Sequence, residues 1–424
     1  MTADVLGLFP PGSRLADDGT VTVAGCRLDD LAQEFGTPVL VVAEDALRRR
    51  ARDYLAAFRS RWPRADVAFA SKSFPCTAVQ RVMSEEGLHL DVAGAGEIVT
   101  ALSAGVDPAR LVMHGNAKTD EDIELAVRSG VGLVVVDNFD DIDRLERIVP
   151  TGQKQPCLVR VIPGVAASTH AAVATGHAGS KFGLLPDDAR DAIARIGRSG
   201  VLRCDGVHTH VGSQLLNTEQ LAAAVEPIAR LGTFDVYDLG GGLGVRYTYD
   251  EHPPDLDAYA EAMVERARAV LPADSRIIVE PGRSMVGAAA CTVYRVTTVK
   301  RGAVTHVAVD GGMGDNLEVS LYGQRFEATI ANRVGSDAQD EGELVTVVGR
   351  HCESGDQLID GVRLQHPAVG DLLAVPVTGA YCYTMSNQYN GARRIPVVFA
   401  ADGAARLVVR RDTWADLLSR DVTA

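Results

Sequence analysis

The sequence predicts an α/β protein with a (β/α)8 TIM-like barrel and a C-terminal, mostly-β domain. Short apolar runs alternate with amphipathic helical stretches from about residue 36 to 285, and eight such runs indicate a barrel. After Arg283 the segments become rich in Val and Thr and long helices are missing, which indicates the second domain. A doubly wound open sheet is the main alternative, because counting strands does not show that a sheet closes.

Each predicted barrel strand is a short apolar run that ends in polar residues or glycine. The eight runs are 67–70, 88–92, 111–114, 133–137, 157–161, 206–211, 236–239 and 277–280. The helical stretches between them include 78–86, 120–128, 140–148, 186–198, 219–231 and 256–270. Several of these stretches begin with Asp, Thr or Pro, which are typical of helix N-termini.

The β-rich domain is expected to comprise residues 286–424 together with 1–35, while residues 36–285 form the barrel. The segment 20–25 has a strand–turn pattern, which favours pairing of the N-terminus with the β-rich domain. The strands expected after the barrel are 293–300, 304–309, 343–348, 371–376, 395–399 and 405–410.

Composition excludes several classes of protein. Apolar residues make up 46% of the 424 residues, which is too many for a disordered chain. The net charge of −14 and the lack of a basic run argue against binding to nucleic acid. No run of 18 apolar residues occurs, so no membrane span is expected. The N-terminus shows no secretory pattern, and the seven cysteines form no Cys-x-x-Cys pair, so we expect a reduced, cytoplasmic protein without a zinc knuckle.

The active site of such a barrel lies where the strands end. Lys72, the glycine turn 240–242 and Glu280 each follow a predicted strand. A partly desolvated lysine can attack an aldehyde, a glycine turn can bind phosphate, and a carboxylate can pair with a pyridinium nitrogen. Together they suggest pyridoxal phosphate (PLP). Taken singly, they could be a surface lysine, a flexible turn and a structural Glu–Arg ion pair.

Other polar residues at strand ends have less specific interpretations. His208 and His210 leave one face of a strand, so one of them could stack on a flat ring, although a hydrogen-bonded core histidine is the commoner case. The segment 351–356 could supply a proton donor and an amine-binding carboxylate, or it could be a solvated turn. The remaining polar strand ends are Asp91, His114, Asn116 and Arg160. No three residues have metal-ligand spacing, so no metal is expected.

In combination, these segments resemble the fold-type III PLP-dependent decarboxylases, in particular the diaminopimelate decarboxylases, over roughly residues 20–415. The motifs that carry the resemblance are 69–74 (FASKSF), 91–97 (DVAGAGE), 114–118 (HGNAK), 175–176 (TG), 180–183 (SKFG), 210–214 (HVGSQ), 238–242 (DLGGG), 280–283 (EPGR), 352–356 (CESGD), 379–381 (GAY) and 387–390 (NQYN). The resemblance implies an alanine racemase-like barrel and decarboxylation of an amino acid with PLP.

The resemblance also implies roles for individual residues. Lys72 would hold PLP covalently, His210 would stack on its ring and Glu280 would pair with the ring nitrogen. The other implied cofactor-binding residues are Asp91, Glu97, Ser213, Gly240, Gly241, Gly242, Gly282, Arg283 and Tyr389. Arg283 and Tyr322 would face the distal end of the substrate. Cys352 as proton donor and Glu353 as amine binder would come from the partner subunit, which implies a homodimer with shared active sites.

One departure from the family pattern concerns the substrate. The family has Arg-Pro where this chain has Glu318-Val319, and that Arg helps to grip the distal carboxylate of diaminopimelate. A carboxylate in place of the Arg repels another carboxylate, or pairs with Arg283 and silences it. We therefore expect a substrate without a free distal carboxylate, such as ornithine, lysine or a specialised-metabolism intermediate.

Three alternatives stay open. Glu318 could point away from the site, which would leave a meso-diaminopimelate decarboxylase that makes L-lysine. A racemase on the same fold would need a tyrosine base opposite Lys72, whereas the segment 352–356 favours decarboxylation. An inactive regulatory homologue would be expected to lack Lys72, Cys352 or Glu280, and all three are present.

Overall fold

The computed structural model describes residues 5–164, 179–334 and 342–422. The motif at 175–176 lies outside these residues. The chain divides into two compact units. The barrel unit comprises Arg48–Val245 and His252–Met285, and the β unit comprises Met1–Leu47, Arg246–Glu251 and Val286–Ala424.

The barrel unit is a closed, eight-stranded parallel barrel, which confirms the predicted fold class and excludes the open sheet. Its strands are β5 (Ala65–Ala70), β6 (His89–Val92), β7 (Leu111–Met113), β8 (Leu133–Val136), β9 (Gln155–Val161), β10 (Leu202–Thr209), β11 (Val236–Asp238) and β12 (Arg276–Val279). Closure is made by β12, which pairs with β5 through Ile278 and Asp66 among others. Small and branched side chains fill the interior, namely Ala68, Val112, Leu133, Val135, Leu158, Val236 and Ile278.

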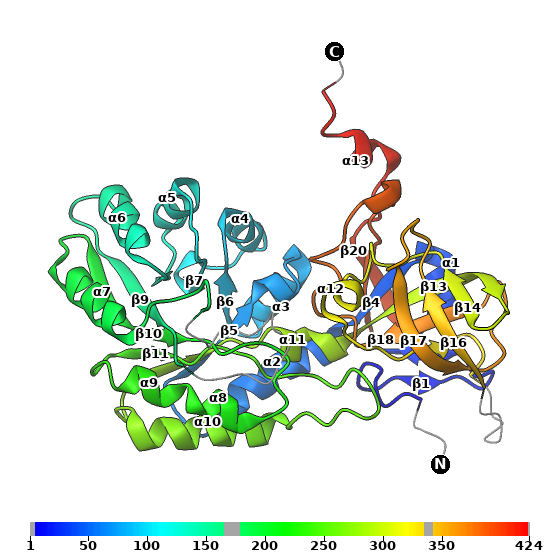
Figure 1. The fold of residues 1–424 in the computed structure, drawn as a ribbon, viewed down its shortest axis with the longest axis horizontal. Coiled ribbons are helices and arrows are strands. Elements are labelled where there is room, and N and C mark those ends of the chain that lie inside the picture. The colour runs from blue at the N-terminus through cyan, green and yellow to red at the C-terminus, as the bar shows by residue number, and fades with distance from the viewer. Residues whose placement is uncertain (1–4, 165–178, 335–341, 423–424) are drawn as a thin grey trace. The chain divides into compact units, whose positions relative to one another are not determined.

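Helices follow the strands around the outside of the barrel, as Figure 1 shows for α4 to α7. The helices of this unit are α2 (Glu44–Arg59, which begins in the β unit), α3 (Thr77–Glu85), α4 (Ala95–Ser103), α5 (Asp120–Ser129), α6 (Phe139–Ile148), α7 (Pro186–Arg198), α8 (Thr218–Ala223), α9 (Val225–Ala229), α10 (Leu256–Val270) and α11 (Arg283–Val286), with the short 3-10 turns η1 (Ser71–Ser73) and η2 (Pro108–Arg110). The single helix expected at 219–231 is two helices, α8 and α9. Pro227 explains the break, because it has no N–H to donate to the preceding turn.

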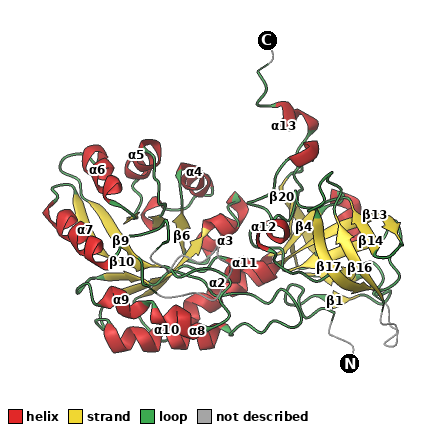
Figure 2. Ribbon diagram, in the orientation of Figure 1, coloured by secondary structure: helices red, strands yellow, loops and turns green. Residues whose placement is uncertain are grey.

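The β unit is built mainly from strands, as Figure 2 shows. Its strands are β1 (Arg14–Leu15), β2 (Val21–Val23), β3 (Cys26–Arg27), β4 (Val39–Ala43), β13 (Ala290–Lys300), β14 (Thr305–Val309), β15 (Thr329–Ile330), β16 (Glu343–Val348), β17 (Gln357–Leu364), β18 (Leu372–Pro376), β19 (Val397–Ala401) and β20 (Ala404–Val409). Its helices are α1 (Leu28–Phe35), α12 (Glu318–Tyr322) and α13 (Trp414–Leu418), with the turns η4 (Gly287–Ala289) and η5 (Tyr389–Gly391). Most of the strands form one nine-stranded sheet, and β1 to β3 form a separate small sheet.

The division between the units differs from the expected boundary at residue 36. Strand β4 is buried along its whole length and is hydrogen bonded to β13 and β19 of the β unit, not to a barrel strand. Residues 36–47 therefore belong with the β unit, because sheet pairing and not position in the chain decides membership. Among the described residues, no helix combines the length and apolarity that crossing a membrane requires.

Candidate active site

Lys72 lies in the turn η1, directly after barrel strand β5. Ser73 Oγ fixes this turn by donating to the carbonyl oxygen of the last β5 residue at 2.8 Å. The side chain of Lys72 is exposed, and its charge interacts with the carboxyl groups of Asp91 and Glu97. The turn thus presents an amine at the end of the barrel where the strands finish.

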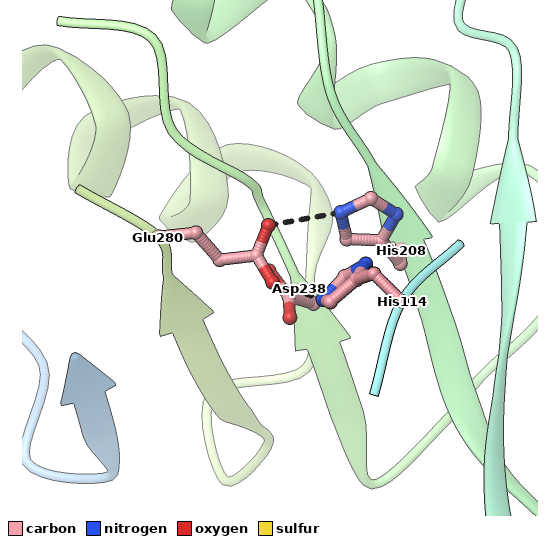
Figure 3. A group of neighbouring side chains, drawn as sticks. All are labelled: His114, His208, Asp238 and Glu280. Carbon is pink, nitrogen blue, oxygen red and sulfur yellow. Dashed lines mark hydrogen bonds and ion pairs between the residues drawn. The ribbon is translucent and has the colours of Figure 1, made fainter. Parts of the chain in front are cut away.

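Glu280, the residue after β12, is the centre of a buried group of four side chains (Figure 3). Its Oε1 lies 2.6 Å from His114 Nε2, and its Oε2 lies 3.1 Å from His208 Nε2. The two imidazole rings meet edge to face with centroids 4.8 Å apart. Asp238 is the fourth member, and one donor or acceptor atom from each residue lies within 4.8 Å of the others. We call these four residues the Glu280 cluster.

The electrostatics of the Glu280 cluster shift the pKa values of its two acids, Glu280 and Asp238, in opposite directions. Burial would raise the pKa of Glu280, but His114 and His208 outweigh it and lower that pKa well below its usual value. Burial would lower the pKa of His114, yet Asp91 and Glu280 raise it overall. Burial lowers the pKa of His208 to about 4. Burial and the charge of Glu280 raise the pKa of Asp238 well above its usual value. Glu280 is therefore the acid that stays ionised.

Asp91, expected at the site, lies in strand β6, and Glu97, also expected there, lies in the first turn of α4. Asp91 Oδ1 is 3.8 Å from His114 Nε2, and burial raises the pKa of Asp91. Glu97 Oε2 accepts a hydrogen bond from Ala93 N at 2.8 Å, and burial raises the pKa of Glu97 to about 7. Asp91 is thus linked to the Glu280 cluster through His114. Glu97 instead stabilises the turn between β6 and α4 through its hydrogen bond with Ala93 N.

The glycine turn 240–242 follows β11 and packs directly against the Glu280 backbone. Glu280 N donates to the carbonyl oxygen of Gly240 at 2.9 Å. A Cβ on Gly241 would lie 2.0 Å from the carbonyl oxygen of Glu280, and Gly240 and Gly242 have φ of +68° and +127°. Side chains are therefore excluded from this turn. Gly241 N also donates to His210 Nδ1 at 3.2 Å, which ties the expected ring-stacking histidine to the turn.

Ser213, Gly282 and Arg283, all predicted to bind the cofactor, form a connected group at the end of β12. The buried Arg283 donates from Nε to Ser213 Oγ at 3.3 Å. Gly282 lies so close to β5 that a Cβ would be 3.0 Å from the Cβ of Ala70. These contacts join the end of β12 both to the segment after β10 and to the strand before Lys72.

Sequence reasoning gave no role to His114, Asp238 or Arg160, although two of them were noted at strand ends. Arg160 Nη1 lies 3.7 Å from Asp137 Oδ1, and its guanidinium lies 4.4 Å from the centre of the Phe182 ring. The signal for His114 was its place directly after the third barrel strand. Asp238 was noted only as the first residue of the DLGGG motif, and nothing in the sequence gave its carboxyl group a role of its own.

The remaining predicted residues lie in the β unit. Glu318 is buried, and its Oε2 accepts a hydrogen bond from the Tyr247 hydroxyl at 3.2 Å. Tyr322 ends the same helix, α12, and is half-buried.

Cys352, Glu353 and Tyr389 form a second group in the β unit. Cys352 and Glu353 are exposed, and Cys352 N donates to Asn390 Oδ1 at 2.8 Å. The ring of His351, the residue before Cys352, lies 5.8 Å from the ring of Tyr389. The loop that carries the proposed proton donor and the loop that carries Tyr389 are thus neighbours, whereas Lys72 and Glu280 belong to the barrel unit.

The barrel residues fit PLP. An ionised, buried carboxylate suits a protonated ring nitrogen, an exposed amine suits the aldehyde, and a glycine turn suits a phosphate. Lys72, Glu280 and Gly240 to Gly242 would hold these three parts of the cofactor. When bound, PLP supplies an electron sink for the electron pair left by a departing carboxylate.

Comparisons with known proteins agree with this assignment. Residues 44–287 match the family model described as pyridoxal-dependent decarboxylase, pyridoxal binding domain. The chain is 44% identical to a diaminopimelate decarboxylase of Actinosynnema pretiosum subsp. auranticum, covering 98% of this chain and 95% of that protein. It is 40% identical to a diaminopimelate decarboxylase of Bacillus subtilis, covering 97% of each chain.

Solved structures give the same result. The diaminopimelate decarboxylase of M. jannaschii, crystallised in co-complex with L-lysine, superposes with a TM-score of 0.91 at 27% identity and 98% coverage of both chains. The diaminopimelate decarboxylase of Helicobacter pylori, complexed with L-lysine, superposes with a TM-score of 0.85 at 28% identity, covering 92% of this chain and 98% of that chain.

Proposed function

Since the chain belongs to the fold-type III pyridoxal-dependent decarboxylases and is a PLP-dependent carboxy-lyase, we propose that it decarboxylates a diamino acid whose distal end carries no free carboxylate. The single observation that carries the proposal is the burial of Glu318. The family pattern has an Arg at this position. Ornithine, lysine and specialised-metabolism intermediates with a distal amine are the candidate substrates.

The physical reason is electrostatic. A carboxylate repels a second carboxylate, and the repulsion grows as water is excluded. Glu318 is 1% exposed, and the Tyr247 hydroxyl, itself buried, donates to one of its oxygens. An ionised acid in this position would select a distal ammonium group over the distal carboxylate of diaminopimelate.

The other residues have separate tasks in the proposal. Lys72 holds the cofactor, and Glu280 keeps its ring nitrogen protonated. The geometry of the site selects the bond to the α-carboxylate for cleavage. Cys352 returns a proton to the reacting carbon, and Glu353 binds a substrate amine. A racemase would need a tyrosine base opposite Lys72, which the segment 352–356 does not provide.

The second candidate substrate is meso-diaminopimelate, which would give L-lysine. The names of the relatives at 44% and 40% identity favour it, as do the two related structures described with L-lysine. The two candidates differ in one respect, namely whether the site must accept a carboxylate at the distal end of the substrate.

A substrate panel tests the proposal. Purified protein with PLP is incubated with D- and L-ornithine, D- and L-lysine and meso-diaminopimelate, and CO2 release is measured. We expect turnover of a substrate with a distal amine, and we expect Glu318→Arg to shift the preference towards meso-diaminopimelate. Glu34→Arg, a charge reversal at an exposed position, is the matched control and should leave the preference unchanged. Efficient turnover of meso-diaminopimelate by the wild type would contradict the altered substrate.

A separate experiment tests the attachment of the cofactor. Borohydride reduction of the holoenzyme followed by peptide mapping should find the label on Lys72. Lys72→Ala should lose both the label and the visible absorbance of the bound cofactor. A label on another lysine, or none, would remove the basis of the proposed function.

We also propose a homodimer in which Cys352 and Glu353 complete the partner's site. Mixing Lys72→Ala with Cys352→Ala tests this, because each variant lacks a different half of the site. Activity recovered on mixing two inactive variants supports sharing, whereas no recovery after subunit exchange contradicts it. A reduced, cytoplasmic setting is part of the same proposal, since no disulfide joins any of the seven cysteines, each of which lies within the described ranges.

A further inference from the structure

We propose that Asp238 is a positioning residue that holds a proton next to Glu280 and so leaves Glu280 as the ionised member of a buried acid pair. The inference depends on the use of PLP and not on the identity of the substrate. It assigns a function to a residue that the sequence left without one.

The geometry distinguishes the two acids. Glu280 faces a histidine with each of its oxygens, at 2.6 Å and 3.1 Å. Asp238 faces no cation at such a distance: its Oδ1 accepts from Gly240 N at 3.0 Å, and its Oδ2 has no hydrogen-bond partner among the described residues. Asp238 is 0% exposed, so its carboxyl group is shielded from bulk solvent. A proton on Oδ2 gives this oxygen a donor to offer to Glu280.

Two neighbouring buried carboxylates do not both ionise unless cations compensate them. The charged and titratable groups near Asp238 are Glu280, Asp91, His114, His208, Arg160 and Tyr259. Both histidines contact Glu280, at 2.6 Å and 3.1 Å. Arg160 lies 3.7 Å from a different acid, Asp137, so each of these basic groups is placed against another acid. The pKa of Asp238 is raised, by burial first and by Glu280 second, in agreement with a retained proton.

The consequence concerns both the turn and the cofactor. A protonated Asp238 accepts a hydrogen bond from Gly240 N with one oxygen and donates one to Glu280 with the other. It therefore fixes the position of the Glu280 side chain relative to the glycine turn. An ionised Asp238 would add a second negative charge beside Glu280. This charge would raise the pKa of Glu280, and Glu280 would then be a weaker partner for a protonated ring nitrogen.

A matched pair of isosteric variants tests the assignment. Asn reproduces a protonated Asp, with one acceptor and one donor in the same places, and Gln reproduces a protonated Glu. PLP is titrated into the apoenzyme, with its visible absorbance as the readout. We expect Asp238→Asn to keep the Kd for PLP within about threefold of wild type, and Glu280→Gln to weaken it by about tenfold or more, as expected for loss of a charged hydrogen bond. Circular dichroism verifies that both variants fold.

Infrared spectra of the holoenzyme give a readout that does not depend on affinity. Spectra are recorded at about pH 9, where acids such as Glu97 and Asp315, whose pKa values are raised to about 7, are ionised. The difference spectrum between wild type and Asp238→Asn should show the C=O stretching band of a protonated carboxylic acid, and this band should persist in Glu280→Gln. If Asp238→Asn does not fold, the wild type and Glu280→Gln spectra still decide the matter.

Several results would overturn the proposal. They are the reverse order of the two affinities, equal losses in both variants, an acid band that is absent in wild type, and an acid band that is lost in Glu280→Gln. Histidines and carboxylates at this spacing also suit a divalent cation. A stoichiometric divalent metal in the purified holoenzyme would therefore likewise overturn it. None of these outcomes affects the substrate panel. The proposal for Asp238 can therefore be disproved without disproving the proposed substrate, and the reverse also holds.

Discussion

Lys118 Nζ lies 2.7 Å from Asp141 Oδ2, and the two side chains are 1% and 0% exposed. Lys118 also donates to the carbonyl oxygen of Gly115 at 2.6 Å, and Asp141 Oδ2 accepts from Asp137 N at 3.0 Å. The ion pair thus joins the segment after β7, where His114 lies, to the start of α6. It therefore stabilises the segment that carries His114, one member of the Glu280 cluster.

The first prediction concerns this pair. Lys118→Met should lower the free energy of unfolding by about 3–5 kcal/mol, because it leaves a buried carboxylate without its cation. Urea unfolding followed by circular dichroism measures the change. Lys118→Met combined with Asp141→Asn is the control, and it should recover part of the loss because no unpaired charge remains. A Lys118→Met loss below about 1 kcal/mol would show that the pair behaves like an exposed one.

The second prediction concerns the glycine turn. Gly241→Ala should abolish or strongly weaken PLP binding, because its Cβ would lie 2.0 Å from the carbonyl oxygen of Glu280. Equilibrium titration with PLP measures the effect. Gly197→Ala is the control: this glycine lies within α7, and its Cβ would meet nothing within 4 Å. That change should stabilise the protein by about 0.5–1 kcal/mol. Unaltered PLP affinity in Gly241→Ala would exclude the turn as a cofactor site.

The third prediction concerns pH and Asp315. This residue is buried, and its Oδ2 accepts from Gly312 N at 3.0 Å. Burial and the charges of Asp310 and Asp356 raise the pKa of Asp315 to about 7. The charge of Arg411 has the opposite effect but does not cancel this increase. The native state therefore binds this proton more tightly than the unfolded chain, whose Asp pKa is about 4. Its contribution to stability is present at low pH and is lost as the pH rises from about 4 to about 7.

Asp315→Asn should remove this contribution, because Asn keeps the acceptor for Gly312 N and carries no proton to lose. Above about pH 7 the variant should be more stable than wild type by up to about 4 kcal/mol, and near pH 4 the two should be equal. Urea unfolding at a series of pH values measures the difference. A difference that did not vary with pH would contradict the raised pKa.

The fourth prediction concerns Cys352, which is exposed, whereas five of the other cysteines are buried and Cys204 is intermediate. Cys352→Ala should lower the turnover number by about 10²–10⁴-fold and leave PLP binding unchanged, as expected for loss of a proton donor. Iodoacetamide should inactivate the wild type at the rate at which mass spectrometry shows Cys352 to be modified. Cys382→Ala, at a buried position, is the control for nonspecific loss. Full activity in Cys352→Ala would require another proton donor.

Local sequence patterns predicted the barrel well. The structure has α7 and α10 at the residues expected, and each of the eight apolar runs overlaps a barrel strand. Each of these elements buries one face or one run of side chains, so its periodicity is visible in a short window.

Elements that depend on distant pairing were harder to predict. Strand β4 (VLVVA) is an apolar run that was not assigned as a strand, and only its pairing with β13 and β19, which lie hundreds of residues away in the chain, places it in the β unit. Strand β17 was also missed, since its burial alternates irregularly and a bulge interrupts its pairing with β16.

The sequence by itself determined the barrel, the residues at its strand ends and, through their order, the decarboxylase family. It could do so because strand ends, glycine turns and reactive side chains are local features. Only the tertiary structure decided that both oxygens of Glu280 face histidines and that Asp238 lies beside it without a cation of its own. These relationships arise from barrel closure, which brings residues from four different strands to one buried point and so makes their protonation states interdependent.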